Sequence, residues 1–273
     1  MDDANSNQHD VIIVGAGPAG LSAALSLSRE HFSVLVLEKE AIGGNLLKIA
    51  NLENYAGFTG SGAELARTMK EQAKQFGANI EYAEVLGVTA TEAGELAVRT
   101  ADQTYGARAV IMANGMKARE LDVAGLTVPI HYCATCDAPV YKDQKIAVVG
   151  GGDSAFQTAL FLASFAEQVY VIARSKPRAR GTLLTRVNEN PKITVLTETL
   201  PTRELLGDEL GVAAVFAEIG SDQQELPQIA PELANAPNLY YAGDCRPEAR
   251  RQVVAAAADG ALAAEAIRDF LTS

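Results

Sequence analysis

Two of the three cysteines in this sequence, Cys133 and Cys136, are separated by two residues and followed directly by Asp137. A Cys-x-x-Cys pair can close and open a small disulfide ring, and this spacing lowers the pKa of one thiol, which makes that thiol a better nucleophile. A zinc site would need two further ligands, but the chain has no second cysteine pair and its three histidines are scattered. We therefore expect a redox-active dithiol and no metal.

A glycine-rich turn near the N-terminus could hold a partner for such a dithiol. The apolar run 10–14 leads into Gly15-Ala-Gly17-Pro-Ala-Gly20, a helix-forming segment follows, and the next apolar strand ends at Glu38. In a Gly-x-Gly-x-x-Gly turn the first glycine allows the tight bend, the second lets the backbone approach a pyrophosphate, and the third brings the helix close to the strand. The helix N-terminus faces the phosphates, and the acid accepts hydrogen bonds from a ribose. The pattern indicates a dinucleotide-binding fold.

A second strand, turn, helix and strand follow the cysteine pair. The run 145–149 enters Gly150-Gly-Gly152-Asp-Ser-Ala155, and the strand after the next helix ends at Arg174. A Gly-x-Gly-x-x-Ala turn in this setting also binds a dinucleotide, so we expect an α/β chain with two Rossmann-like units. Between the two patterns we expect an amphipathic helix and three strands, at 63–76, 80–83, 95–99 and 109–112.

Length and charge limit the class of protein. The 273 residues suffice for one large or two medium domains, and the net charge of −11 argues against nucleic acid or an anionic membrane as partner. The N-terminal residues are acidic and polar, unlike a secretory signal, and the apolar stretch from Val11 is too interrupted by glycine and proline to span a membrane. We therefore expect a cytoplasmic protein, in which a cysteine pair is catalytic rather than structural.

The order of the motifs resembles low-molecular-weight thioredoxin reductases, which are class II FAD-dependent pyridine nucleotide-disulfide oxidoreductases. The resemblance covers nearly the whole chain and is carried by Gly-Ala-Gly-Pro-Ala-Gly at 15–20, Glu-Asn-Tyr-x-Gly-Phe at 53–58, Cys-Ala-Thr-Cys-Asp at 133–137, Gly-Gly-Gly-Asp-Ser-Ala at 150–155 and Ala-Gly-Asp at 242–244. It implies a discontinuous FAD-binding domain, residues 1–118 and 214–273. A truncated NAD(P)H-binding-like domain, residues 119–213, would carry the dithiol.

The resemblance also implies a set of FAD contacts. Asp244 matches the family residue that meets the ribitol and pyrophosphate. Residues 251–253 match a helix N-terminus that faces the isoalloxazine ring, where its partial positive charge stabilises anionic reduced flavin. The remaining cysteine, Cys245, is expected to be a small buried residue. The full implied FAD set is Gly15, Gly17, Gly20, Glu38, Asn45, Asn54, Asp244, Arg251, Gln252 and Val253.

By the same resemblance, electrons pass from a donor through FAD to the Cys133–Cys136 disulfide and then to the disulfide of thioredoxin or a similar protein. Cys136 faces the flavin, Cys133 attacks the substrate disulfide, and Asp137 protonates the leaving thiolate. Asp137 can also act as a helix N-cap, and the two roles are compatible. The family further implies a homodimer.

The electron donor is the point at which the sequence departs from the family. NADPH-using members carry His-Arg-Arg-x-x-x-Arg, which grips the 2′-phosphate, whereas residues 173–179 read Ala-Arg-Ser-Lys-Pro-Arg-Ala and keep only one arginine in register. The chain after residue 208 also omits a β-meander that family members have. The residues left as candidates for an NADPH site are Gly150, Gly152, Ala155 and Arg174.

These departures leave two donors as equal alternatives: NADPH, and a donor other than a pyridine nucleotide, such as ferredoxin or a second flavin. FAD can exchange electrons singly with such a donor and in pairs with thiols, so a flavin site permits both. A thiol oxidase working in the reverse direction is a further alternative. A non-catalytic FAD-binding redox sensor is another, and steady turnover of a protein disulfide would exclude it.

Overall fold

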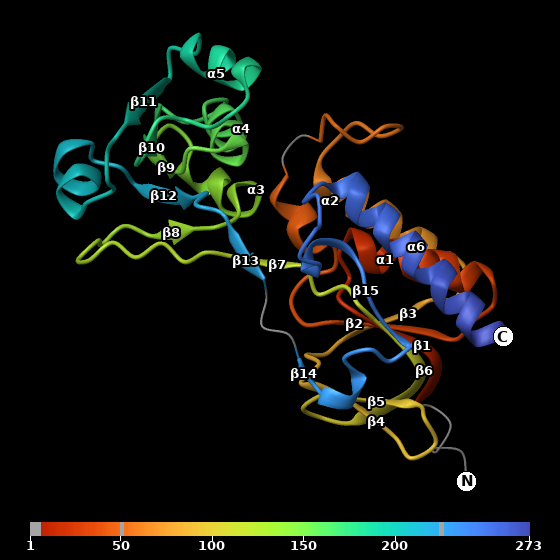
Figure 1. Cartoon of the computed structure of the whole chain (residues 1–273). Coiled ribbons are helices and arrows are strands. Elements are labelled where there is room, and N and C mark those ends of the chain that lie inside the picture. The colour runs from red at the N-terminus through yellow and green to blue at the C-terminus, as the bar shows by residue number, and fades with distance from the viewer. Residues whose placement is uncertain (1–6, 50–51, 224–226) are drawn as a thin grey trace. The chain divides into compact units, whose positions relative to one another are not determined.

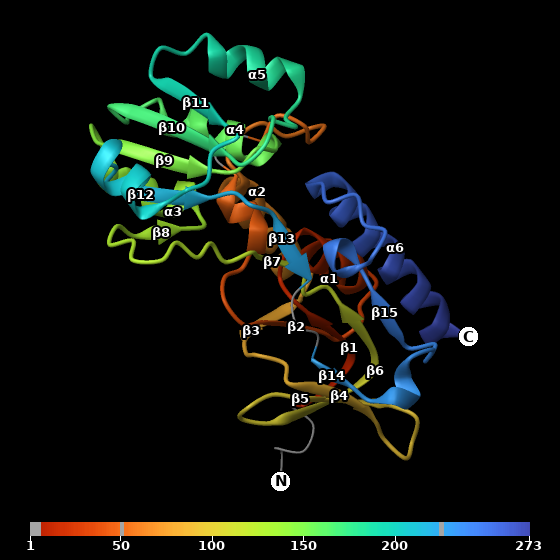
Figure 2. The same ribbon diagram turned by 60° about the vertical axis from the view of Figure 1, so that its left-hand side comes forward.

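The computed structural model describes residues 7–49, 52–223 and 227–273, and the chain divides into two compact units (Figures 1 and 2). Unit 1 comprises Met1–Met116 and Gln223–Ser273, and unit 2 comprises Lys117–Asp222. Each unit contains a sheet with parallel strands and packed helices, and unit 1 is assembled from both ends of the chain. The predicted fold class, α/β with two Rossmann-like units, is confirmed.

Unit 1 is built on one large sheet. Its strands are β1 (Gln8–Val14), β2 (Val34–Glu38), β3 (Asn79–Tyr82), β4 (Gly87–Ala90), β5 (Leu96–Arg99), β6 (Thr104–Met112), β14 (Gln228–Ile229) and β15 (Leu239–Tyr241). The order is β14-β4-β5-β6-β1-β2-β3, with β15 also paired to β6. Strands β3, β2, β1, β6 and β15 run parallel, whereas β4, β5 and β6 form an antiparallel meander. The three predicted strands correspond to β3, β5 and the end of β6.

The core of unit 1 explains the uninterrupted apolar run of β1. Val11 and Ile13 pack on the face covered by helices, and Ile12 and Val14 pack on the face covered by the meander. Because both faces of β1 are buried, the strand shows a continuous apolar run rather than an alternating one.

The helices of unit 1 lie on one face of the sheet. They are α1 (Pro18–Arg29), α2 (Gly62–Gln75) and α6 (Val253–Thr272), with the short helical turns η1 (Gly44–Lys48) and η5 (Gly243–Cys245). The turn η4 (Pro231–Leu233) packs on the other face, where Leu233 joins the cluster of the meander. Helix α2 is the predicted amphipathic helix, and it begins with a capping box between Ser61 and Glu64. Helix α6 runs alongside α1 (Figures 1 and 2), and a Cβ at Gly260 would overlap the Ala19 carbonyl. Within the described residues, no helix combines the length and apolarity needed to cross a bilayer.

Unit 2 contains a five-stranded parallel sheet with the order β11-β10-β9-β12-β8. Its strands are β8 (Ile130–His131), β9 (Lys145–Val149), β10 (Gln168–Ala173), β11 (Ile193–Thr197) and β12 (Ala214–Ala217). Its helices are α3 (Ala134–Asp137), α4 (Asp153–Leu162) and α5 (Gly181–Asn188), with the turns η2 (Ala138–Tyr141) and η3 (Glu204–Glu209). The chain segments that connect the units contain β7 (Met116–Ala118) and β13 (Ser221–Gln223), which pair with each other.

The boundary expected at residues 213 and 214 requires a correction. Strand β12 pairs in parallel with β9 on one side and with β8 on the other, so residues 214–217 belong to unit 2, which continues to Asp222. Unit 2 also begins two residues earlier than expected, at Lys117. Between β11 and β12 the chain forms only the short helix η3. The truncation of this domain relative to the family stays a prediction.

Candidate active site

The dithiol lies at the start of the short helix α3 in unit 2. Cys133 occupies the N-cap position of α3, and the backbone N–H of Asp137 donates to the Cys133 carbonyl over 3.1 Å, which closes the turn. Cys133 is disulfide-bonded, and its sulfur also lies 3.4 Å from the Thr135 hydroxyl oxygen. Spaced i and i+4, Cys133 and Asp137 share one face of the turn. Among the described residues there is no cluster of three side chains that could ligate a metal.

Asp137 faces a histidine that the sequence did not single out. Its Oδ2 lies 3.2 Å from His131 Nδ1, and His131 Nε2 lies 2.8 Å from the Tyr141 hydroxyl. The imidazole is stacked on Phe216, with ring centroids 5.2 Å apart and planes 27° apart. Asp137 directly precedes η2 but makes no capping hydrogen bond with its side chain. Asp137 thus occupies the expected N-cap position, of η2, but its carboxyl group is directed to His131 rather than to the backbone of the turn.

The first glycine-rich turn has the close approaches that its sequence predicts. Gly15 has φ of +104°, and a Cβ there would lie 2.5 Å from the Ala113 carbonyl oxygen. A Cβ at Gly20 would overlap the Gly15 carbonyl oxygen, so only glycine allows α1 to start this close to the turn. A methyl group added at Gly17 would meet nothing within 4 Å, so the backbone there borders open space. That open space at the N-terminus of α1 suits a phosphate group.

Glu38, at the end of β2, supports this turn. It is buried, and its carboxylate accepts hydrogen bonds from the backbone N–H of Ala16 at 2.7 Å and of Glu40 at 2.9 Å. A carboxylate offers about four acceptor positions, so both oxygens retain capacity for a ribose hydroxyl. Glu38 thus holds the turn in place and remains able to bind a nucleotide.

The two asparagines predicted beside the flavin differ in their surroundings. Asn45 lies in η1, next to a glycine whose Cβ would approach Gly17 Cα to 3.7 Å, and its Nδ2 donates to the Met116 carbonyl over 3.1 Å. The structure therefore brings Asn45 to the glycine-rich turn. Asn54 is exposed on the surface of unit 1, and its contact with a flavin stays a prediction.

The C-terminal segment brings a partly buried acid, Asp244, to the same turn. Gly243 has φ of +76° and packs against α1, where a Cβ would lie 2.8 Å from that of Ala19. Burial raises the pKa of Asp244; Arg251 opposes the rise, and Asp259 adds to it. The predicted helix start is also present, because α6 begins at Val253 with Gln252 as its N-cap. Cys245 is buried, as expected, and donates to the Met112 and Ala242 carbonyls.

Asn114 is a candidate site residue that the sequence analysis missed. Its side-chain nitrogen and oxygen are both buried, and neither has a hydrogen-bond partner within the part of the chain that the structure describes. An unsatisfied buried polar group costs about 1–3 kcal/mol, so a ligand is expected to supply the partner. Asn114 follows β6, and its Cα would lie 3.1 Å from a Cβ at Gly15. With the open space at Gly17 and the partly buried Asp244, this unpaired amide fits a bound FAD.

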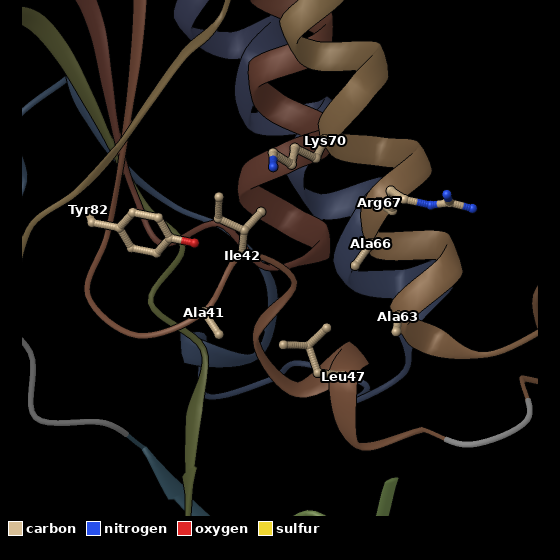
Figure 3. Close-up of a pocket in the computed structure, with 8 residues that line it drawn as sticks. All are labelled: Ala41, Ile42, Leu47, Ala63, Ala66, Arg67, Lys70 and Tyr82. Carbon is tan, nitrogen blue, oxygen red and sulfur yellow. The ribbon is translucent and has the colours of Figure 1, made fainter. Parts of the chain in front are cut away.

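A surface pocket of unit 1 lies between the segment after β2 and helix α2 (Figure 3). It has a volume of about 270 Å³ and contains none of the predicted site residues. In Figure 3 the Tyr82 ring and the Lys70 side chain border it, and the Arg67 guanidinium points away. The pocket is lined by Ala41, Ile42, Leu47, Ala63, Ala66, Arg67, Lys70 and Tyr82.

The second glycine-rich turn, in unit 2, is in contact with the basic loop 174–180. The backbone N–H of Arg178 donates to the Gly151 carbonyl over 2.7 Å, and the Arg180 side chain is 2.6 Å from the Asp153 carboxylate. Among the predicted residues, Gly150 approaches the Glu218 carbonyl, Ala155 is buried beneath the turn, and nothing lies within 4 Å of a Cβ at Gly152. Arg174 is exposed at the end of β10, as are the cations Lys176 and Arg178.

Residues 9–226 match the pyridine nucleotide-disulphide oxidoreductase family. The chain belongs to this family. It is 36% identical over 299 aligned positions to the thioredoxin reductase of Treponema pallidum, across 96% of this chain and 97% of that protein. Because 299 positions exceed the 273 residues of this chain, the relative has segments with no counterpart here.

Solved structures of thioredoxin reductases also match this chain over nearly its whole length. A thioredoxin reductase from Lactococcus lactis matches with a TM-score of 0.85 and 28% identity, over 97% of this chain and 99% of its own. A ferredoxin-flavin thioredoxin reductase from Clostridium acetobutylicum matches with a TM-score of 0.52 and 27% identity, over 97% and 99%. The resemblance inferred from the motifs is confirmed, and with it the oxidoreductase class and FAD as the cofactor.

The site of this oxidoreductase has two parts, one in each unit. Unit 1 gathers the glycine-rich turn, Glu38 and Asn114 with Asp244 from the C-terminal segment, and these groups suit FAD. Unit 2 carries the disulfide at Cys133 with the ionisable pair Asp137 and His131 beside it. FAD supplies a carrier that can deliver an electron pair to a disulfide.

Proposed function

We propose that this chain reduces the disulfide of thioredoxin or of a thioredoxin-like protein, with Cys133 and Cys136 as its dithiol. The observation that carries the proposal is the disulfide-bonded Cys133 at the start of a helical turn that also holds Asp137. A disulfide followed one turn later by a carboxyl group provides both a reversible electron store and a proton donor.

In this proposal the reduced chain reacts in two exchange steps. The Cys133 thiolate attacks one sulfur of the substrate disulfide, that disulfide breaks, and Asp137 gives a proton to the thiolate that leaves. The Cys136 thiolate then attacks Cys133, which re-forms the Cys133–Cys136 disulfide and releases the second substrate thiolate. The dithiol loses two electrons and the substrate disulfide gains two. FAD, held by unit 1, would supply the electron pair for the next cycle.

The proposed FAD contacts are the set predicted from the sequence, with Asn114 added. The glycine-rich turn and the N-terminus of α1 take the pyrophosphate, Glu38 takes a ribose, and Asp244 takes the ribitol side. Asn45 and the start of α6 lie toward the flavin ring in this proposal, and Asn54 joins them only by family analogy.

NADPH is the first candidate for the electron donor. Three exposed cations, Arg174, Lys176 and Arg178, follow the carboxyl end of β10, and the loop that carries them is hydrogen-bonded to the glycine-rich turn. A 2′-phosphate is expected at this place in a Rossmann-like unit, so these cations support NADPH.

A donor other than a pyridine nucleotide is the second candidate. Two observations favour it: only the short helix η3 connects β11 and β12, where the family resemblance implies a β-meander, and the Arg180 guanidinium is already paired with Asp153. The solved relative from Clostridium acetobutylicum is described as a ferredoxin-flavin enzyme. Ferredoxin, or another one-electron donor, is the corresponding donor for this chain.

An anaerobic titration separates the two candidates. The oxidised, FAD-loaded protein is mixed stepwise with NADPH, NADH or reduced ferredoxin while the flavin absorbance is recorded. Stoichiometric bleaching by NADPH selects the first candidate, and bleaching by ferredoxin alone selects the second. Thioredoxin is then added to the reduced protein; absence of thioredoxin reduction in every case contradicts the proposed function and favours the non-catalytic sensor.

We also propose that the chain forms a homodimer, by analogy with its family. We propose a reducing cytoplasm as its compartment, because Cys245 is a thiol outside any disulfide. Multi-angle light scattering should give about twice the mass of one 28.8 kDa chain. A monomer mass at all concentrations tested would contradict the dimer and leave the reductase proposal intact.

A further inference from the structure

We propose that His131 is a positioning residue for Asp137, which it orients and to which it returns protons, with Tyr141 next to it. This inference rests on the proposed function, because it concerns how the acid of that reaction is supplied with protons. The proposal is based on the contacts that His131 makes within unit 2.

The His131 ring is fixed in place on three sides. Strand β8 pairs with β12 so that His131 lies opposite Phe216, on which its ring is stacked. Its two nitrogens then reach Asp137 Oδ2 at 3.2 Å and the Tyr141 hydroxyl at 2.8 Å. A ring held by stacking and by both nitrogens has little freedom, so it fixes the carboxyl group that it contacts.

The exposure of the two side chains suits a relay. The His131 side chain is 21% exposed, whereas that of Asp137 is 39% exposed. The carboxyl group is therefore open to a docked substrate sulfur, while the imidazole lies behind it. The ionisable groups facing the ring are Asp137 from α3 and Tyr141 from η2, and β12, with the sequence Ala-Val-Phe-Ala, contributes none.

The hydrogen-bond chain defines the path of the proton. An ionised carboxylate can only accept, so Nδ1 of His131 carries a hydrogen when Asp137 is ionised, and Nε2 faces the Tyr141 hydroxyl. When a proton arrives at Nε2 from water by way of that hydroxyl, the Nδ1 proton can pass to Oδ2. The leaving thiolate thus takes one proton from Asp137 and the relay restores one, after which proton exchange with water returns the imidazole to its Nδ1–H form; no electrons move in these steps.

The test compares disulfides that differ in their need for an acid. The FAD-loaded protein is reduced with dithiothreitol, freed of it, and mixed with thioredoxin, with bis(2-hydroxyethyl) disulfide or with 5,5′-dithiobis(2-nitrobenzoate). The nitrobenzoate thiolate is a good leaving group and departs without a proton, whereas alkyl thiolates do not. His131→Phe keeps a ring on Phe216 but removes both nitrogens. We expect about a 10- to 100-fold slower reaction with the alkyl and protein disulfides and an unchanged rate with the nitrobenzoate.

Two further variants separate orientation from proton transfer. His131→Asn keeps an N–H donor toward Asp137 but cannot take up and pass on a proton, so the alkyl-disulfide rate should fall while the nitrobenzoate rate stays unchanged. Tyr141→Phe removes only the hydroxyl and should slow the reaction less than His131→Phe does. If His131→Phe fails to fold, as judged by circular dichroism, the other two variants carry the test.

The outcomes that overturn the proposal are distinct from a failure of the proposed function. Equal slowing with all three disulfides would mean that His131 has only a structural role, and unchanged rates with all three would mean that it has none. If the unsubstituted protein reduces the two small disulfides but not thioredoxin, the proposed substrate is wrong, while the comparison of the small disulfides still tests His131.

Discussion

Replacement of Cys136 by serine should abolish the reduction of protein disulfides and leave FAD bound. Without the second sulfur the chain can neither form its internal disulfide nor resolve the mixed disulfide between Cys133 and the substrate. Turnover with thioredoxin should therefore fall to the background rate, and a covalent Cys133–thioredoxin adduct should accumulate, visible as a mass increase that dithiothreitol reverses. Flavin absorbance should persist, since every group assigned to FAD lies in unit 1.

Cys245→Ser is the matched control for this substitution. Its thiol is buried in unit 1 and donates to the Met112 and Ala242 carbonyls at 3.3 Å, contacts that a serine hydroxyl can also make. Burial raises the pKa of the Cys245 thiol, which keeps it protonated and unreactive. Cys245→Ser should retain turnover. If Cys136→Ser retained turnover as well, the dithiol assignment would be wrong.

The local parts of this fold could be read from the sequence because their signals are contiguous. The buried strands β1 and β9 are short apolar runs that pass directly into glycine-rich turns. The strand, the turn and the following helix can therefore be recognised together in the sequence. Helix α2 was predictable for a similar reason, since its apolar stripe and its Ser61 capping box are local.

The parts that were missed depend on pairing between distant segments. Strand β12 was placed in the wrong domain because only its register with β9, Val215 opposite Ala147, assigns it to unit 2. His131 looked like an isolated histidine because its contact with Asp137 requires the two-residue strand β8 to pair with β12. Neither short strand has a pattern long enough to be recognised alone.

Asn114 illustrates the same limit at the cofactor site. Its sequence context, Ala-Asn-Gly after a strand, is typical of an ordinary turn. It becomes a candidate ligand only because β1 and β6 end side by side, with Val14 opposite Met112, which buries its amide next to the first glycine-rich turn. A polar residue two positions after the end of a central strand was the available signal, because ligands bind at the carboxyl ends of parallel strands.

Replacing Gly20 by alanine should lower the stability of the fold, whereas replacing Gly17 by alanine should lower FAD affinity, although the two glycines share one turn. A Cβ at Gly20 would overlap the backbone carbonyl of Gly15, which cannot move without separating α1 from β1. We expect Gly20→Ala to lower the free energy of unfolding of the FAD-free protein by about 3 kcal/mol, since overpacking against backbone is costly. That corresponds to a fall in Tm of about 6–12 °C for a chain of this size.

Gly17→Ala should leave the FAD-free protein as stable as before, because φ at Gly17 is −77° and nothing lies within 4 Å of the added methyl group. The methyl group would instead occupy the space assigned to the pyrophosphate, so FAD affinity should fall about 100-fold, or about 2.7 kcal/mol. Gly152→Ala is the matched control, since its methyl group is equally unobstructed but lies in the second turn, and it should leave FAD affinity unchanged. Thermal unfolding of the FAD-free variants and flavin fluorescence titration measure the two quantities. If Gly17→Ala bound FAD normally, the pyrophosphate would not lie against this turn, and the order of the FAD contacts in unit 1 would have to be reassigned.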